Sequence, residues 1–228
     1  MTSASQRQRR IAVIRKRIVA PQDAYEQCRA FPCTNRTTAD RGEGLNRLYC
    51  RTHIEFYRRH GSYVKRSYSA AELRPYRIKA AQWLRERGDL SVVQRAKIGV
   101  VRLLQTAGAP IEAFRLAGKK PAERARALWA SLRVKGVDPA EILAVWLAVD
   151  MRLRDDPQPD RHREYRYVQV AKLIHRMAGG SHRRWEHERS DGSVQITEMH
   201  RHPVSRGRVL LLVGKQLSDL CEVLESPS

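Results

Sequence analysis

The chain has 228 residues, of which 42% are hydrophobic, 30% are charged and 7% are aromatic, so it is long enough to bury one ordinary core and is not a disordered polymer. Its 44 Lys and Arg residues outnumber its 24 Asp and Glu residues, which gives a formal net charge of +20. This imbalance is larger than an enzyme acting on a neutral substrate needs, and it predicts a polyanionic partner.

Residues 1–22 are predicted to form a basic N-terminal arm. Between Gln6 and Ala20, isoleucines recur at helical spacing among several cations, and no acid occurs before Asp23, a pattern that predicts a short basic helix. Cations set against a nucleic-acid backbone release condensed counterions. A solvated terminal helix and an organelle presequence remain alternatives. The predicted contact residues of the arm are Arg7, Arg9, Arg10, Arg15, Lys16 and Arg17.

Residues 23–68 are predicted to form a zinc-binding module. The chain contains Cys-x4-Cys, then sixteen residues, then Cys-x2-His. Two close ligand pairs separated by a loop can close a tetrahedron around Zn²⁺, and four protein ligands leave no open position for a catalytic water. The alternative is a group of buried thiols near a surface histidine. The predicted ligands of this structural zinc ion are Cys28, Cys33, Cys50 and His53.

The module has few large apolar residues, so metal binding is expected to supply most of its folding free energy and chelation is expected to unfold it. His60 is the substitute ligand if His53 does not bind the metal. The fourth cysteine, Cys221, lies on the apolar face of the last predicted helix and is expected to be a core thiol.

The cysteine segment resembles a short zinc-finger segment of many phage and mobile-element proteins, including accessory segments of some HNH-type endonucleases. The shared pattern is Cys-x4-Cys, Gly-Leu-Cys-x2-His and then Arg-Arg-His-Gly, and it covers residues 28–62, under a fifth of the chain. Residues 46–49 are inserted between Gly44-Leu45 and Cys50, which departs from the pattern. The resemblance implies zinc at the four predicted ligands and DNA association through the following helix.

Basic and aromatic residues alternate after His53, so charges can meet phosphates while rings pack or stack. Phe56 is expected in the core, whereas Arg58 and Arg59 are expected at the contact surface, because burying paired arginines without carboxylates is costly. The alternative is that Phe56 and Tyr57 only pin the module to the helical body. The predicted contact residues here are Arg51, Arg58, Arg59, His60, Lys65 and Arg66.

Residues 69–180 are predicted to form a helical body. The first helix begins with a capping-box pattern at Ser69 and Glu72, and Pro75 either kinks it or marks its true start. The segment Ile142–Leu153 is apolar on all sides and is expected in the middle of a bundle. The helices are expected from Ser69 to near Gly88, from Ser91 to Gly108, from Pro121 to Gly136, from Asp138 to Leu153, and from a cap at Asp160 to Gly179.

Residues 181–228 are predicted to form a basic β-hairpin and a C-terminal helix, the helix over about 206–225. Asp191-Gly192 lies between two alternating runs, which is a hairpin signal. The ribbon histidines could form a second metal site or a pH-sensitive surface, but we favour polar positions along a nucleic-acid groove. These histidines are His182, His187, His200 and His202, and the predicted contact residues are Arg183, Arg184 and Arg201.

The sequence predicts no catalytic residue. An HNH-like site would need Asn or His on the helix after His200 and His202, and that helix has neither. Asp155, Asp156 and Asp160 could hold Mg²⁺, although a solvated loop is the favoured interpretation. The patterns of P-loop nucleotide-binding proteins, serine hydrolases and zinc proteases do not occur.

We therefore predict a mainly α protein, a helical bundle with an N-terminal structural zinc module and one C-terminal β-hairpin. Its predicted function is non-catalytic DNA binding in a bacterial mobile-element or phage-related system, with DNA favoured over RNA. The prediction also allows for protein partners in a larger nucleoprotein complex. The alternatives are a nuclease or recombination enzyme, and an RNA-binding component. No run of eighteen apolar residues and no secretory signal occurs, so we expect no membrane contact and a cytoplasmic, nucleoid-associated location.

Overall fold

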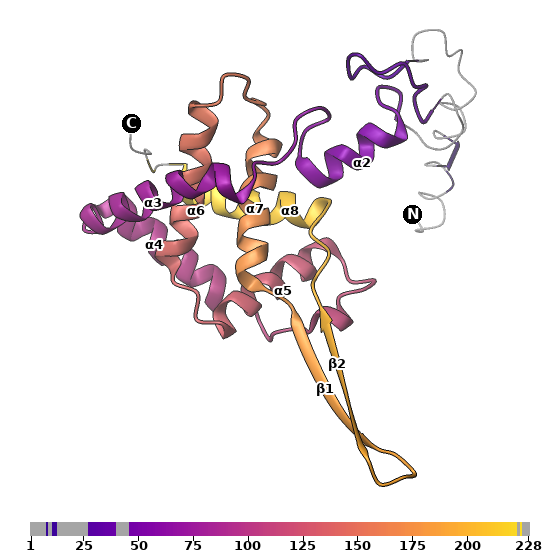
Figure 1. The fold of residues 1–228 in the computed structure, drawn as a ribbon. Helices are drawn as coiled ribbons and strands as arrows, with labels where there is room; N and C mark the ends of the chain where they lie inside the picture. The colour runs from indigo at the N-terminus through magenta and orange to yellow at the C-terminus, as the bar shows by residue number, and fades with distance from the viewer. Residues whose placement is uncertain (1–7, 9–10, 13–26, 40–45, 223, 225–228) are drawn as a thin grey trace. The chain divides into compact units, whose positions relative to one another are not determined.

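The computed structural model describes residues 8, 11–12, 27–39, 46–222 and 224. The chain divides into two compact units, Met1–Tyr57 and Arg58–Ser228. The described part is mainly helical with one two-stranded antiparallel hairpin, as predicted (Figure 1). Gln8, Ile11 and Ala12 of the predicted arm are helical, and the six arm cations predicted to contact nucleic acid lie outside the described residues.

The described part of the first unit is a small cysteine-centred fold that leads into helix α2 (Arg51–His60). An isolated β-bridge joins Gln27 to Arg36. The buried hydrophobic residues are Cys28, Ala30 and Cys50, with Cys33 and Tyr49 packed against them. Within residues 27–39 and 46–57 this core is small.

In the second unit, buried side chains from all the helices α3 to α8 join in one core. Helix α6 lies at its centre, since every residue from Ile142 to Met151 is buried, which confirms the placement of the most apolar segment. None of the helices within the described residues is long and apolar enough to cross a membrane. The elements are α3 (Ala70–Glu86), α4 (Ser91–Gln105), η1 (Ala113–Arg115), α5 (Pro121–Val134), α6 (Pro139–Arg154), α7 (Arg163–Ala178), β1 (Ser181–Glu188), β2 (Val194–Arg201) and α8 (Arg208–Cys221).

Local start signals set most of the helix boundaries. The capping box is confirmed, because Ser69 Oγ accepts the Glu72 backbone N–H at 3.2 Å while Glu72 Oε2 accepts the Ser69 N–H at 2.7 Å. Pro75 lies inside α3 and does not start it. The prediction that Asp160 caps α7 is wrong. His162 is the N-cap of that helix, and Asp160 Oδ1 instead accepts the backbone N–H of His162 at 3.0 Å.

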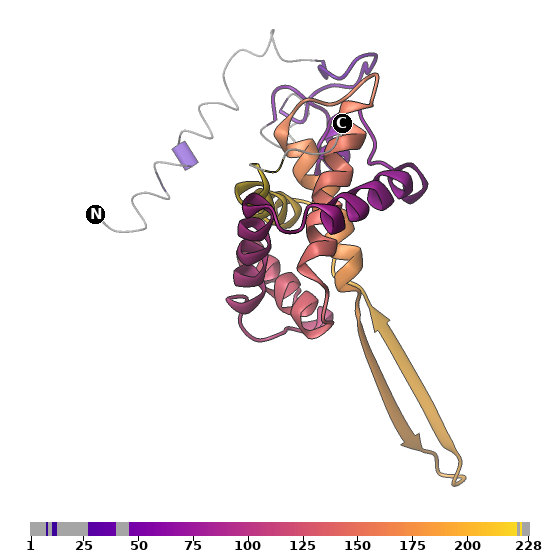
Figure 2. The same cartoon turned by 90° about the vertical axis from the view of Figure 1, so that its left-hand side faces the viewer.

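Strands β1 and β2 form a ribbon that projects from the helices of the second unit (Figure 2). The predicted turn is confirmed: Gly192 has a φ of 78°, and its N–H donates to the Arg189 carbonyl at 2.9 Å. Every residue of β2 is exposed. At the base of the ribbon, Ser181 Oγ accepts the backbone N–H of Ala113 at 2.8 Å, which attaches the ribbon to the body.

Helices α7 and α8 pack closely at Gly214, so a larger residue there is expected to lower the stability of the protein. A Cβ added at Gly214 would lie 2.4 Å from both the Cα and the carbonyl oxygen of Tyr167. We expect Gly214→Ala to lower the free energy of unfolding by about 2 kcal/mol, because a helix backbone cannot yield as a side chain can. Urea denaturation measures this loss.

Gly99→Ala is the matched control, because Gly99 also lies inside a helix. Its added Cβ would meet only side-chain atoms of Leu220, the nearest at 2.6 Å. Alanine is favoured over glycine in a helix by about 1 kcal/mol, so this variant should lose much less stability. Equal losses of unfolding free energy for the two variants would show that the backbones of α7 and α8 are farther apart at Gly214 than the structure shows.

Candidate metal centre and nucleic-acid interface

The first cysteine pair is held by a tight turn. The Cys33 N–H donates to the Ala30 carbonyl at 2.7 Å, and the Cys28 N–H donates to the Asn35 carbonyl at 2.9 Å. These bonds fold residues 28–35 back on themselves. The two thiols, which are separated by four residues, are thereby brought to one side of the turn.

The second pair sits at the start of α2. Cys50 directly precedes the helix and His53 is in its first turn, where the Ile54 N–H donates to the Cys50 carbonyl at 3.0 Å. A residue just before a helix and one three positions later lie on the same face. A Cys-x2-His pair at a helix start therefore presents both ligand atoms together.

Residues 46–49, which depart from the zinc-finger pattern, join the two ligand pairs. Asn46 Oδ1 accepts the backbone N–H groups of Leu48 and Tyr49, both at 2.9 Å. The Leu48 carbonyl then accepts the Arg29 N–H at 2.8 Å. The inserted segment thus turns through Asn46 and pairs with the backbone beside Cys28.

The four predicted ligands converge. One ligand atom from each of Cys28, Cys33, Cys50 and His53 lies within 4.8 Å of the others. His53 Nδ1 is 3.4 Å from Cys28 Sγ and 3.3 Å from Cys50 Sγ, and the sulfurs of Cys33 and Cys50 are 4.0 Å apart. Tetrahedral bonds of about 2.3 Å to sulfur and about 2.0 Å to nitrogen would separate such atoms by about 3.5 to 3.8 Å. The cluster is therefore close enough to hold a metal ion.

The environment favours a thiolate at one of these cysteines. Burial raises the pKa of the Cys50 thiol, but hydrogen bonds from the backbone and ring of His53 and from the neighbouring thiols outweigh this and lower it to about 6. For Cys28, burial dominates and raises the pKa above its ordinary value. Metal ligation requires thiolates, and the Cys50 thiol ionises more readily than the Cys28 thiol.

In the second unit, the charges of Arg59, Arg66 and Lys172 act on His60, and the charge of Arg176 acts on Lys172. We call these four residues the cationic cluster. Lys172 Nζ donates to Ser67 Oγ at 2.8 Å. His60 Nδ1 lies 2.9 Å from the same Oγ and accepts the Ser67 backbone N–H at 3.0 Å. Since Nδ1 accepts a backbone proton, the His60 ring is neutral.

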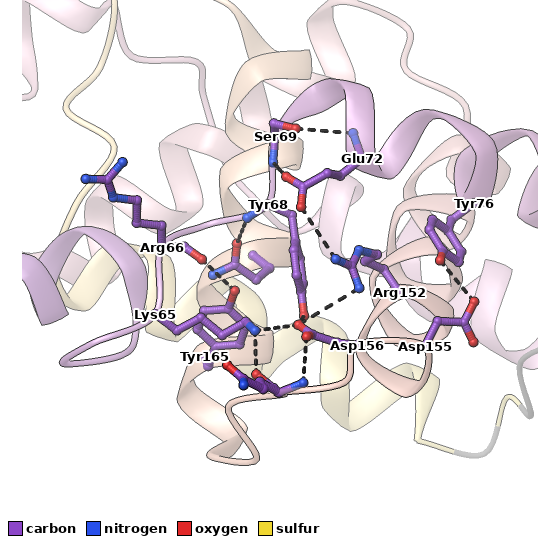
Figure 3. Close-up of polar contacts among 12 residues, drawn as sticks. Lys65, Arg66, Tyr68, Ser69, Glu72, Tyr76, Arg152, Asp155, Asp156 and Tyr165 are labelled. Atoms are coloured by element: carbon purple, nitrogen blue, oxygen red, sulfur yellow. Dashed lines mark hydrogen bonds and ion pairs between the residues drawn. The ribbon is translucent and has the colours of Figure 1, made fainter.

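Buried contacts with α7 hold the chain segment that carries this cluster. Gln169 Nε2 donates to the His60 carbonyl at 2.9 Å. The Tyr165 hydroxyl donates to the Arg66 carbonyl at 2.7 Å (Figure 3). These two bonds come from a buried glutamine and a buried tyrosine, so the cations are supported by the core.

The cationic cluster concentrates positive charge around His60 and Lys172. Burial and the charges of Lys172, Arg59 and Arg66 lower the pKa of His60 to about 4. Burial, together with Arg176 and Arg59, also lowers the pKa of Lys172. The charges that lower these two pKa values are those of cations, so the cluster favours the binding of an anion.

The other predicted contact residues fall into two groups. Arg51, Arg58 and Arg184 are exposed, and Arg184 is 3.2 Å from Glu186. Lys65 and two ribbon arginines have partners within the second unit. Lys65 Nζ lies 2.6 Å from Asp156 Oδ2, Arg183 pairs with Glu112, and Arg201 lies over the Phe114 ring at 6.0 Å from its centroid.

Asp156 is the main residue that the sequence analysis misplaced, because the expectation of a solvated loop is wrong at this position. Its side chain is 5% exposed. It accepts the Tyr68 hydroxyl at 2.6 Å, and Arg152 is 4.0 Å away on the other side (Figure 3). With Lys65, Tyr68 and Arg152 around it, this carboxylate is occupied as a structural group and is not an open ligand for Mg²⁺.

The comparisons with known proteins gave no relative. No family model, no curated protein and no solved structure matches the chain.

Proposed function

We propose that this protein binds DNA without catalysing a reaction, and that contacts to phosphates supply most of the affinity. The observation that carries the proposal is the cationic cluster, in which Lys172 donates to Ser67 and the charges of Arg59, Arg66 and Arg176 act on Lys172 or His60. The formal net charge of +20 supports a polyanionic partner for the chain as a whole.

A DNA phosphate fits the chemistry of this cluster. Lys172 is a point-charge donor, and the guanidinium groups of Arg59 and Arg66 can donate paired N–H groups to phosphate oxygens. The lowered pKa of Lys172 shows that its charge is destabilised by burial and by Arg176 and Arg59. A bound anion would relieve that repulsion, so the cluster gains more from a phosphate than the same cations would if spread over the surface.

We infer that the metal held by the first unit is Zn²⁺. Three cysteines and one histidine form a donor set typical of structural zinc sites, and together they would fill all four tetrahedral positions. The ion would fix the start of α2, whose last turn carries Arg58, Arg59 and His60. In this proposal the metal stabilises the module and takes no part in a reaction.

The biological setting is proposed from the resemblance alone. The segment covering residues 28–62 is similar to zinc-finger segments of phage and mobile-element proteins, in which a basic stretch follows the last ligand. We therefore propose a bacterial mobile-element or phage-related role near the nucleoid, with DNA favoured over RNA as the partner. The proposal allows for protein partners in a larger complex.

Replacing both Arg59 and Arg66 with alanine is expected to weaken duplex DNA binding to a similar extent across sequences. Each phosphate contact contributes about −0.9 to the slope of log affinity against log salt concentration, so the slope should become shallower by about two units. Fluorescence anisotropy across a salt series measures the effect. The control carries Arg95→Ala and Arg126→Ala, two exposed arginines on α4 and α5, and removes the same charge.

The variant pair also separates the alternatives. If the control loses as much slope as the cluster variant, the affinity reflects net charge and the cluster is not the contact surface. Metal-dependent cleavage of plasmid DNA by the wild-type protein would replace the proposal with the nuclease alternative. Preferential binding of structured RNA would replace it with the RNA-binding alternative.

A further inference from the structure

The β1–β2 ribbon has two chemically different faces. Cross-strand partners share a face and neighbours along a strand alternate. One face carries Arg183, Trp185 and His187 opposite Met199, Thr197 and Gln195. The other face carries His182, Arg184, Glu186 and Glu188 opposite His200, Glu198, Ile196 and Val194. All the glutamates of the two strands therefore lie on the second face, together with a cross-strand histidine pair.

Three side chains on that second face converge. His182 and His200 are register partners, and their rings are stacked with centroids 4.1 Å apart and planes 11° apart. A Glu198 carboxylate oxygen lies 3.5 Å from His182 Nε2 and 3.9 Å from His200 Nε2. One ligand atom from each residue lies within 4.8 Å of the other two.

We propose that His182, His200 and Glu198 bind a late first-row divalent metal ion such as Zn²⁺, Ni²⁺ or Cu²⁺. Two imidazoles and one carboxylate form a donor set that suits these ions. Ca²⁺ and Mg²⁺ suit it less well, because they favour oxygen ligands alone. Three protein ligands leave at least one coordination position for water. This site is open and contains no thiolate, in contrast to the four-ligand cluster of the first unit.

Binding requires a change that the surface allows. In the stacked arrangement the two ring planes are nearly parallel, and each Nε2 lone pair lies in the plane of its ring, so the rings must turn about χ2 for both to point at one ion. The side chains of His182, His200 and Glu198 are 46%, 66% and 47% exposed, and this exposure leaves the rings room to turn. The negative charge of Glu198 offsets part of the charge of the ion.

The ion would connect the two strands of the ribbon. A two-stranded ribbon without other support has marginal stability in water, and the described contacts of this ribbon with the body come from its base, at Ser181, Arg183 and Arg201. A metal bridge between the register partners His182 and His200 would oppose strand separation and slippage. The metal would thus stiffen the ribbon without using the face that carries Trp185 and Arg183.

The test is calorimetric titration of Ni²⁺ into the full chain, after the four-ligand cluster has been filled with one equivalent of Zn²⁺. The wild-type protein should bind one further equivalent. The variant with both His182→Asn and His200→Asn should bind none, and Glu198→Gln should bind at least about tenfold more weakly. His187→Asn, on the opposite face of β1, is the control and should bind as the wild type does.

Zinc content is measured after each titration, because displacement of Zn²⁺ from the cysteine cluster would imitate a second site. The proposal is wrong if the zinc-loaded wild-type protein binds no further ion. It is equally wrong if the double histidine variant keeps the wild-type stoichiometry and affinity. The substituted side chains are on the exposed ribbon, so loss of binding in these variants will not arise from unfolding of the helical core.

Discussion

Replacing Cys50 with serine is expected to abolish zinc binding and to unfold the first unit, while most of the helical signal of the protein persists. Cys50 lies within hydrogen-bonding distance of both Cys33 and His53 and is buried, so its loss opens the cluster. Structural zinc contributes about 10 to 16 kcal/mol of apparent binding free energy in small zinc domains. Among the described residues of this unit, the core formed by Cys28, Ala30 and Cys50 is too small to replace that contribution.

Zinc content per chain and far-ultraviolet circular dichroism check this expectation. Cys221→Ala is the control, because Cys221 is fully buried in the helical core and burial raises its pKa to about 12. That variant should keep its zinc and lose some core stability. If Cys50→Ser retained a full equivalent of zinc, the assignment of the four ligands would be wrong.

Replacing Asp156 with alanine is expected to destabilise the second unit by about 3 kcal/mol. The substitution leaves Lys65 and Arg152, which are only 23% and 17% exposed, without the carboxylate between them, and removing one partner of a buried ion pair is strongly destabilising. It also leaves the Tyr68 hydroxyl without its acceptor. Urea denaturation followed by circular dichroism measures the loss.

Asp155→Ala is the matched control for this prediction, because it removes the same side chain one residue earlier. Asp155 is exposed and accepts only the Tyr76 hydroxyl at 2.9 Å among the described contacts, so its loss should cost about 1 kcal/mol or less. If the two variants lost equal stability, Asp156 would not be the centre of the network shown in Figure 3.

The same carboxylate gives the second unit a defined pH dependence. Burial raises the pKa of Asp156, but the hydrogen bonds from Lys65, from Tyr68 and from the Gln158 backbone outweigh it and lower the pKa to about 2. A carboxyl group whose pKa is lower in the folded state stabilises that state above its unfolded pKa of about 4. We expect this contribution to be lost as the pH falls from about 4 through 2. The unfolding free energy of Asp156→Ala should lack this pH-dependent loss.

Local signals in the sequence predicted the helices well. The capping box at Ser69, the proline at the first position of α5 and the Asp138-Pro139 start of α6 each act within a few residues, so no knowledge of the fold is needed to find them. The same holds for the Asp191-Gly192 turn. Asp160 shows where this kind of prediction fails. It lies two residues before the N-cap His162, and an aspartate at either position gives a similar sequence signal for a helix start.

Partners far apart in the chain could not be predicted. Asp156 meets residues 88 and 91 positions earlier, Tyr68 and Lys65, and its neighbours Asp155 and Pro157 suggested a solvated turn. Arg183 meets Glu112 in the same way. By contrast, the convergence of Cys28, Cys33, Cys50 and His53 was predictable, because tetrahedral coordination would require close pairs of ligands and that requirement is visible in the spacing.

The measurement that tests DNA binding most directly is fluorescence anisotropy of the zinc-loaded protein with labelled duplex DNA, single-stranded DNA and RNA across a salt series. We predict tight binding to duplex DNA at low salt, with an affinity that falls steeply as salt rises because several phosphates are contacted. Weak binding that is indifferent to the polymer would contradict the account and would make the charge of +20 a property of the surface or a match for an acidic protein.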